Sequence, residues 1–384
     1  YALSVTRDGA IPIHFKAYDG NRTDDTLHWD TWLTLRGIVG RSDFLYVADS
    51  KLCVAQILMN MDRNQGRFIT MLPRTRSEVK EFNNKLLISE VRWEKIYSKR
   101  SSRNPKKVDI YETAIGLYQM KEGFRLHWFR SSMKKRRDFD EREEKILTAL
   151  DHLRELNNTA NTKTPRTEKK FRKKVNEIIN KFGVGHWVHA DITLEKREEF
   201  KQKKRGPATK ETTYRKIIRM IPRIHCHRNL DGIAKSEAMD GLFPLATNTN
   251  LTPVEVLKSY KYQPTLEKRH STLKSVLQVA PVFLKKNDRI EALMFVYFLA
   301  QIISALIERQ VRIAMIKQGK KSIQILPEER PSRHPTTEQV FRLFQHQARR
   351  LLYSGKNHIQ TFSEPLTVVQ KEILGLLNIS HSIY

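Results

Sequence analysis

Cysteine is scarce in this sequence, which has only Cys53 and Cys226 among its 384 residues. Two cysteines argue against a disulfide scaffold and fit a protein of a reducing cytosol. The segment His225-Cys226-His227 brings three potential zinc ligands together, but the CxxC and HExxH spacings of common zinc sites are missing. Walker, Rossmann and Ser-His-Asp patterns are missing too, which argues against the corresponding nucleotide-binding and hydrolase classes.

Long apolar runs are also missing. The longest candidate, Ala292–Ile307, has 16 residues and contains Gln301 and Ser304. A membrane-spanning helix needs about 20 apolar residues, so we expect a buried helix and no membrane association. The chain opens on Tyr1 rather than on methionine. We therefore expect it to be part of a longer protein.

Negative charge is in short supply, because 42 Asp and Glu face 70 Lys and Arg, for a net charge of +28 and a pI near 10.0. Such a balance favours a polyanionic partner, since phosphates release counterions when basic side chains neutralise them. Charge alone does not distinguish DNA, RNA and a membrane surface. The basic runs Lys134–Arg137 and Lys201–Arg205 are either phosphate contacts, which we favour, or solvated faces.

The first part of the chain alternates in the manner of an α/β protein. Strands are expected at Tyr1–Thr6 and Ile11–Tyr18, with a tight hairpin at Asp8-Gly9. A helix at Thr26–Val39 and a short apolar strand at Phe44–Ala48 follow. A carboxylate directly after such a strand, here Asp49, projects at the sheet edge where α/β folds place ligands. Alternatively, Asp49 caps the next helix.

Later segments give weaker but readable patterns. We expect a hairpin from Glu112–Met120 and Phe124–Arg130, and an antiparallel helix pair whose apolar faces carry Ile146 and Phe171. The remaining expected elements are strands at Trp187–Leu194, Tyr214–His225 and Leu242–Thr247, a long helix at Asp288–Met315 that is buried all round, and helices at Glu338–Leu352 and Val368–Leu377.

The stretch from Tyr260 to Lys274 carries the most specific pattern. Tyr260, Glu267 and Lys274 are spaced seven apart and share one face of a helix. The segment Thr252–Glu255 predicts the start of that helix, with a cap, a proline and a capping-box glutamate. Pro264 predicts a kink one turn before Glu267.

This stretch resembles the signature helix of a large group of bacterial insertion-sequence transposases, in which Tyr, Arg, Glu and Lys are separated by gaps of two, three and six residues. Tyr260, Glu267 and Lys274 match three of these positions, and Gln263 stands in place of the arginine. The resemblance implies that Glu267 is the last acid of a DDE metal-binding triad and that Tyr260, Gln263 and Lys274 lie at the DNA. Glutamine removes the bidentate phosphate contact of an arginine.

The neighbourhood of Asp49 resembles a subgroup of these transposases. The matching segments are Val47–Cys53, Gly66–Phe68 and Leu72–Arg76, although Ser50-Lys51 departs from the residues usual after the aspartate. The resemblance implies that Asp49 is the second acid of the triad and a catalytic metal ligand together with Glu267. The cofactor would be Mg²⁺ or Mn²⁺, since carboxylate oxygens suit hard divalent ions.

The implied fold is an α/β protein with a ribonuclease H-like (integrase-like) catalytic core, a large α+β insertion and an α-helical C-terminal tail. The expected boundaries are 1–74 for the first part of the core, 75–235 for the insertion domain, 236–282 for the second part of the core with the signature helix, and 283–384 for the C-terminal helical region.

The implied function is DNA transposition by a cytoplasmic, nucleoid-associated bacterial enzyme that binds transposon ends and target duplex as a homodimer in a synaptic complex.

The first triad aspartate belongs on a central strand that we expect upstream of this chain, which leaves two flanking strands unpaired. Asp24 and Asp25 would lie about 14 Å away, too far to share ions about 4 Å apart. A non-catalytic DNA-binding remnant is the main alternative. An RNA-binding protein is supported only by charge.

Overall fold

The computed structural model describes seven stretches of the chain, residues 2–18, 27–100, 108–159, 167–203, 206–207, 212–273 and 284–383. The protein is a mixed α/β chain with a mixed sheet and about 46% helix. It divides into two compact units. Unit 1 consists of Tyr1–Gly66 and Lys258–Tyr384, and Unit 2 consists of Arg67–Leu257. This division differs from the expected one, which ended the first core segment at residue 74 and the insertion at 235.

Unit 1 begins with a hairpin, a helix and a short strand, as the sequence predicts. The hairpin turns through Gly9 and Ala10, which both have positive φ, and Thr6 N–H donates to the Ile11 carbonyl at 2.9 Å. The elements of this part are β1 (Ala2–Val5), β2 (Pro12–Lys16), α1 (Leu27–Val39), β3 (Leu45–Ala48), η2 (Ser50–Leu52) and α2 (Ala55–Arg63).

The rest of Unit 1 is mainly helical. Its elements after α7 (Pro253–Tyr260) are α8 (Pro264–Ser271), α9 (Asn287–Lys317), η4 (Pro327–Glu329), α10 (Thr337–Phe344), β12 (Arg349–Ser354), β13 (Asn357–Ser363), α11 (Val368–Leu377) and η5 (His381–Ile383). The capping box expected at Thr367 is present, because Thr367 N–H donates to the Gln370 side chain at 2.7 Å and Gln370 N–H donates back.

Two expectations for this part were wrong. The segment Glu338–Leu352 is not one helix, because α10 ends at Phe344 and residues from Arg349 onward pair as a β12–β13 hairpin. Gly355, with φ of 59°, makes the turn that the helical interpretation overlooked. The tail is therefore not purely α-helical.

Helix α9 was expected to be buried all round and is buried on one face only. Phe298, Ala305 and Val311 are buried, whereas Val296 and Ile303 on another face are more than half exposed. By length and composition alone α9 could cross a membrane, which is weak evidence for a membrane helix. Its buried face also carries polar groups, since Gln301 donates to the Arg269 carbonyl at 2.9 Å.

Unit 2 contains a sheet and a helical arm with a long ribbon. Its elements are β4 (Arg67–Met71), α3 (Ser77–Ile88), β5 (Trp93–Arg100), β6 (Val108–Ala114), β7 (Tyr118–Gln119), β8 (Arg125–Ser131), α4 (Ser132–Asn158), α5 (Glu168–Phe182), β9 (Val188–Gln202), β10 (Tyr214–Arg228), α6 (Leu230–Glu237), β11 (Leu242–Thr247) and the first turns of α7.

The strands of the Unit 2 sheet follow the order β4-β11-β8-β6-β5, all antiparallel, with β7 beside β8. The segment expected as one strand, Glu112–Met120, is divided between β6 and β7. Strand β11 lies between β4 and β8, so residues from both sides of the expected boundary at 74 form one sheet.

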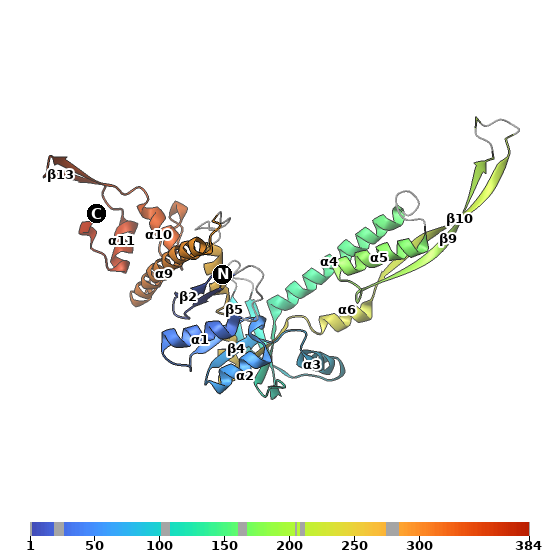
Figure 1. The fold of residues 1–384 in the computed structure, drawn as a ribbon, viewed down its shortest axis with the longest axis horizontal. Coiled ribbons are helices and arrows are strands. Elements are labelled where there is room, and N and C mark those ends of the chain that lie inside the picture. Colours follow the sequence, from blue (N-terminus) through green and yellow to red (C-terminus); the bar gives the residue numbers. More distant parts are fainter. Residues whose placement is uncertain are drawn as a thin grey trace. The chain divides into compact units, whose positions relative to one another are not determined.

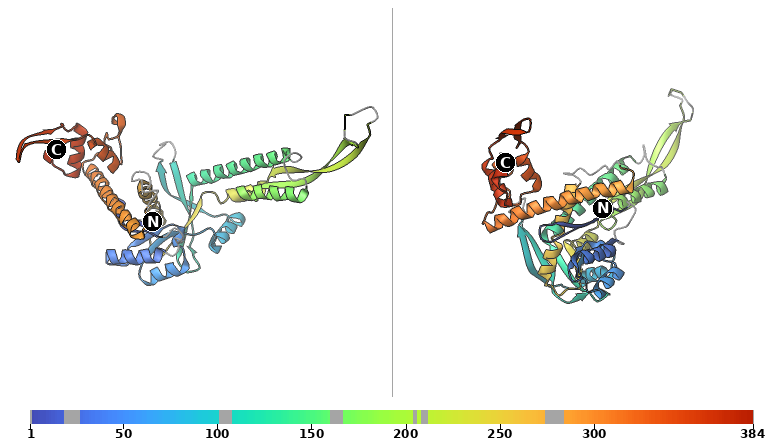
Figure 2. Two further views of the ribbon diagram at one scale, coloured as in Figure 1. Left: turned by 45° about the horizontal axis from the view of Figure 1, so that its top comes forward. Right: turned by 60° about the vertical axis from the view of Figure 1, so that its left-hand side comes forward.

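The arm of Unit 2 has its own apolar core. Ile146 and Leu153 of α4 pack with Phe171 and Val175 of α5 and with Ile221 of the ribbon, which confirms the expected helix pair. Figures 1 and 2 show α4 and α5 along one end of the β9–β10 ribbon, while the other end extends beyond them.

Candidate functional site

Asp49 stands at the end of the short strand β3, where the apolar run of the sequence stops. Its side chain is exposed, and Oδ1 accepts a hydrogen bond of 2.9 Å from the Lys51 backbone N–H. That bond caps η2. The capping alternative raised by the sequence is therefore correct as a description of the local geometry, and it occupies one carboxylate oxygen.

Tyr46, within β3, was not predicted as part of the site. Its pKa is raised above the usual value by burial first, and then by the negative charge of Asp49 and by Tyr18. Nδ1 of His28, on α1, lies 3.0 Å from the Tyr46 hydroxyl. A tyrosine inside an otherwise apolar strand was the only sequence signal for this polar contact.

The helix that carries Glu267 is interrupted where the proline predicts a kink. Helix α7 ends at Tyr260 and α8 begins at Pro264. The turn between them is tight, since Gln263 N–H donates to the Tyr260 carbonyl at 3.1 Å and Leu266 N–H donates to the Gln263 carbonyl at 2.9 Å. Glu267 lies in the first turn of α8, and its side chain is exposed.

The charges of both predicted acids affect Tyr260. Burial raises the pKa of its hydroxyl to about 12, and the carboxylates of Asp49 and Glu267 contribute in the same direction. The structure thus brings both predicted acids within electrostatic reach of one hydroxyl. Tyr260 itself differs from the expected groove-lining residue, because its side chain is only 9% exposed.

The other two predicted DNA contacts have different outcomes. Gln263 is half-buried and lines a cavity of about 560 Å³ that Asp49 also lines. Lys274 lies outside the residues that the structure describes. The shared face of Tyr260, Glu267 and Lys274 therefore stays a prediction.

Arg269 fixes α8 and was not predicted. Its guanidinium is buried, donates to the carbonyls of Ala10 at 3.1 Å and Gly9 at 3.2 Å, and pairs with Glu308 at 3.0 Å. One side chain thereby ties the helix of Glu267 to the β1–β2 hairpin and to α9. These partners are far apart in sequence, so no local pattern marks them.

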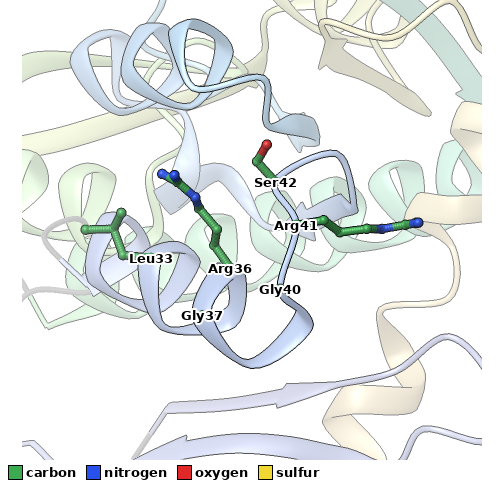
Figure 3. Close-up of a pocket in the computed structure, with 6 residues that line it drawn as sticks. All are labelled: Leu33, Arg36, Gly37, Gly40, Arg41 and Ser42. Atoms are coloured by element: carbon green, nitrogen blue, oxygen red, sulfur yellow. The ribbon is translucent and has the colours of Figure 1, made fainter.

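A second pocket opens at the end of α1, and its lining is Leu33, Arg36, Gly37, Gly40, Arg41 and Ser42. Figure 3 shows the side chains of Arg36 and Arg41 pointing away from one another. Arg41 pairs with Asp43 at 3.1 Å, and Arg36 lies over the Trp32 ring. The two guanidinium groups therefore do not form a joint clamp for one phosphate.

Two exposed carboxylates suit one Mg²⁺ ion, which keeps several waters and binds proteins through one or two acids. Asp49 and Glu267 are both exposed. A two-ion centre needs more ligands, and no group of three His, Cys, Asp or Glu side chains is gathered for a metal within the described stretches. Two acids alone would supply ligands for one hydrated ion rather than for two.

The basic run Lys134–Arg137, favoured as a phosphate contact, lies in the first turns of α4, and three of its four side chains pair with acids one turn further on. Lys134 pairs with Asp138 at 2.5 Å, and Arg136 with Asp140 at 3.0 Å. Arg137 also faces Glu141 at 3.6 Å. These i,i+4 pairs agree better with the solvated-face alternative. In the other run, Lys204 and Arg205 lie outside the described residues.

Comparison of the chain with protein-family models, with curated proteins and with solved structures finds no match.

Proposed function

We propose that this chain belongs to a DDE transposase with a ribonuclease H-like core, which cleaves and joins DNA at transposon ends. The observation that carries the proposal is that the carboxylates of Asp49 and Glu267 both raise the pKa of Tyr260. These acids lie more than two hundred residues apart in the sequence. A shared metal site requires the two carboxylates to lie close together, and the net charge of +28 suits a DNA substrate.

In this proposal Asp49 and Glu267 hold Mg²⁺ or Mn²⁺. A bound divalent ion supplies charge stabilisation for the attacking and leaving oxygens of a phosphodiester. The residues of this chain orient that site: Arg269 anchors the helix of Glu267, and the N–H of Lys51 holds one oxygen of Asp49. The third acid of the triad, and with it full activity, is proposed to come from a segment ahead of Tyr1.

A non-catalytic DNA-binding remnant is the second candidate. The capping bond of Asp49 favours it, because an aspartate that caps η2 has a structural reason to be present without any metal. Both candidates bind DNA as dimers in a cytoplasmic setting, and they differ in cleavage.

The test is metal-dependent nicking of a supercoiled plasmid that carries the genomic flanks of the coding sequence. Three proteins are compared: this chain, a version extended by the upstream coding sequence, and that version with Glu267→Gln. Glu338→Gln is the matched control, since Glu338 is an exposed helical acid that pairs with Arg342 one turn away. Gel shifts at several salt concentrations are recorded with the same DNA.

We expect the extended protein and its Glu338→Gln variant to nick in Mg²⁺ or Mn²⁺, and the Glu267→Gln variant to bind without nicking. This chain alone should bind and not nick, with affinity that falls by at least about tenfold between 50 and 200 mM salt. An extended protein that binds DNA but never nicks it would support the non-catalytic remnant. Nicking by this chain that depends on Glu267 would mean that the first acid lies within it.

A further inference from the structure

The β9–β10 ribbon of Unit 2 separates the residues of the segment His225-Cys226-His227. Successive side chains of a strand point to opposite faces. Cys226 is half-buried and packs against the apolar core of the arm, whereas His225 and His227 are exposed. The three potential zinc ligands that are neighbours in the sequence are therefore divided between the two faces of the ribbon, and Cys226 does not share an ion with the histidines.

The opposite strand supplies a new partner for His227. Strands β9 and β10 pair antiparallel, and their register places His189 directly opposite His227. Side chains of directly opposite residues lie on the same face of the ribbon. His189 is exposed as well, and the centres of the two rings are 5.2 Å apart. Because the pair joins two strands, no local sequence motif marks it.

The distance between the rings agrees with a shared metal ion. Zn–N bonds of about 2.1 Å, and about 1.1 Å from each nitrogen to its ring centre, put two imidazoles of a tetrahedral ion about 5.2 Å apart. The observed separation equals this value. Adjacent imidazoles of a square-planar ion would be closer, at about 4.5 Å. The ring planes are inclined by 42°, so face-to-face stacking does not explain the contact.

The next pair on the same face of the ribbon is Asp191 and His225. Asp191 is exposed, and its negative charge beside the histidine pair favours a cation. His225 has another contact, because its Nε2 lies 3.2 Å from the Thr193 hydroxyl, further along the ribbon. No group of three potential ligands is gathered here or elsewhere among the described residues. Water would therefore complete the coordination of an ion at the histidine pair.

We propose that His189 and His227 bind one Zn²⁺ ion from the two strands of the ribbon, with water in the remaining positions. Imidazole nitrogens suit zinc, whereas Mg²⁺ prefers oxygen ligands. The ion connects β9 to β10 and thereby stabilises this part of the ribbon, because it binds the paired strands in preference to the open ones. The site contains neither Asp49 nor Glu267 and does not depend on the proposed function.

The test is isothermal titration calorimetry of the full chain with ZnCl₂, and with MgCl₂ in parallel. Every protein carries Asp49→Asn and Glu267→Gln, so that these two carboxylates contribute no binding. His189→Ala and His227→Ala each remove one proposed ligand. His225→Ala is the matched control, since it removes an exposed histidine of the same face and strand. Hydrogen exchange is measured in peptides that cover residues 188–191 and 225–228, with the β12–β13 hairpin as reference.

We expect one Zn²⁺ per chain and a loss of affinity of at least about tenfold in His189→Ala and in His227→Ala, against less than about twofold in His225→Ala. ZnCl₂ should slow exchange in both ribbon segments and leave β12–β13 unchanged, and MgCl₂ should do neither. Unchanged affinity after either ligand substitution, or an equal loss in His225→Ala, would overturn the proposal. Zinc binding that leaves exchange in both ribbon segments unchanged would also overturn it, because the ion would then lie elsewhere.

Discussion

The strands of the two units differ in how deeply they are buried. In Unit 2, β11 is paired on both edges, with β4 and β8, and its residues from Phe243 to Thr247 are all buried. In Unit 1, β3 is as short and apolar as a buried strand should be, yet three of its four residues are only half-buried. Strand β3 is the end strand of its sheet, so the comparison teaches that an apolar sequence alone does not bury a strand.

Within the described residues each unit has one buried arginine, and the two arginines differ in their acceptors. In Unit 2, Arg142 binds Asp240 through two hydrogen bonds of 2.8 and 2.9 Å, and both side chains are less than 10% exposed. In Unit 1, Arg269 has one bond to Glu308 and two to backbone carbonyls. The first arrangement rests mainly on one buried acid, with Glu237 as a longer contact at 3.4 Å, and the second is shared among three acceptors.

The largest effect should come from breaking the Unit 2 pair. Asp240→Ala leaves the buried Arg142 guanidinium with only its longer contact to Glu237 and should cost about 3–5 kcal/mol of unfolding free energy. Glu308→Ala should cost about half as much, because Arg269 keeps both carbonyl acceptors. Urea unfolding, with hydrogen exchange in β11 and α8 to separate the units, measures both. Asp151→Ala, at an exposed pair, is the control and should change little. Equal losses for Asp240→Ala and Glu308→Ala would remove the distinction between the two arginines.

Acid should weaken Unit 2 through Glu78, whose side chain is 7% exposed. Burial alone would raise the pKa of Glu78, but hydrogen bonds from Arg76 at 2.9 Å and from the Lys121 N–H at 3.0 Å lower it to about 2. Since the folded pKa lies below the unfolded one of about 4.5, the stabilisation is present above pH 4.5 and is lost as the pH falls toward 2. Its size is on the order of 3 kcal/mol.

Urea unfolding at pH 7 and pH 3 checks this dependence. Glu78→Gln should reduce the difference in stability between the two pH values, and Glu81→Gln, an exposed neighbour on α3, should not. In Unit 1 the acid with a depressed pKa is Asp8, held by Arg309 but fully solvated, so it should contribute little. A pH response unchanged in Glu78→Gln would contradict the assignment.

The smallest effect concerns the site of Unit 1. Burial and the two carboxylates raise the pKa of Tyr260 to about 12, so the fold favours the neutral phenol, and its contribution to stability is lost as the pH rises from 10 to 12. In Asp49→Asn/Glu267→Gln the Tyr260 pKa should fall but stay above 10, because burial persists. Titration of ring-labelled tyrosines by NMR, with Tyr260→Phe for assignment and Glu338→Gln as control, measures the shift. A Tyr260 pKa equal in both proteins would show that the acids do not converge there.

Local chemistry determined much of the secondary structure. The Thr252 and Glu255 capping box begins α7, because both partners lie within one turn. The Asp8-Gly9 turn and the Pro264 kink have the same local origin, since each depends on the backbone limits of the residues present. The sequence could also place Asp49 after a strand and Glu267 on a helix.

Only the tertiary structure decided which faces are covered. The β12–β13 hairpin replaced a helix because pairing across Gly355 prevailed over a helical pattern in Arg349–Leu352. Arg269 found its acceptors at Gly9, Ala10 and Glu308, none of which is a neighbour in the chain. Tyr260 is buried, and its pKa responds to Asp49 and Glu267, which are far apart in the sequence. Burial and the proximity of charges depend on contacts between residues that are distant in the sequence. Local sequence patterns do not predict these contacts.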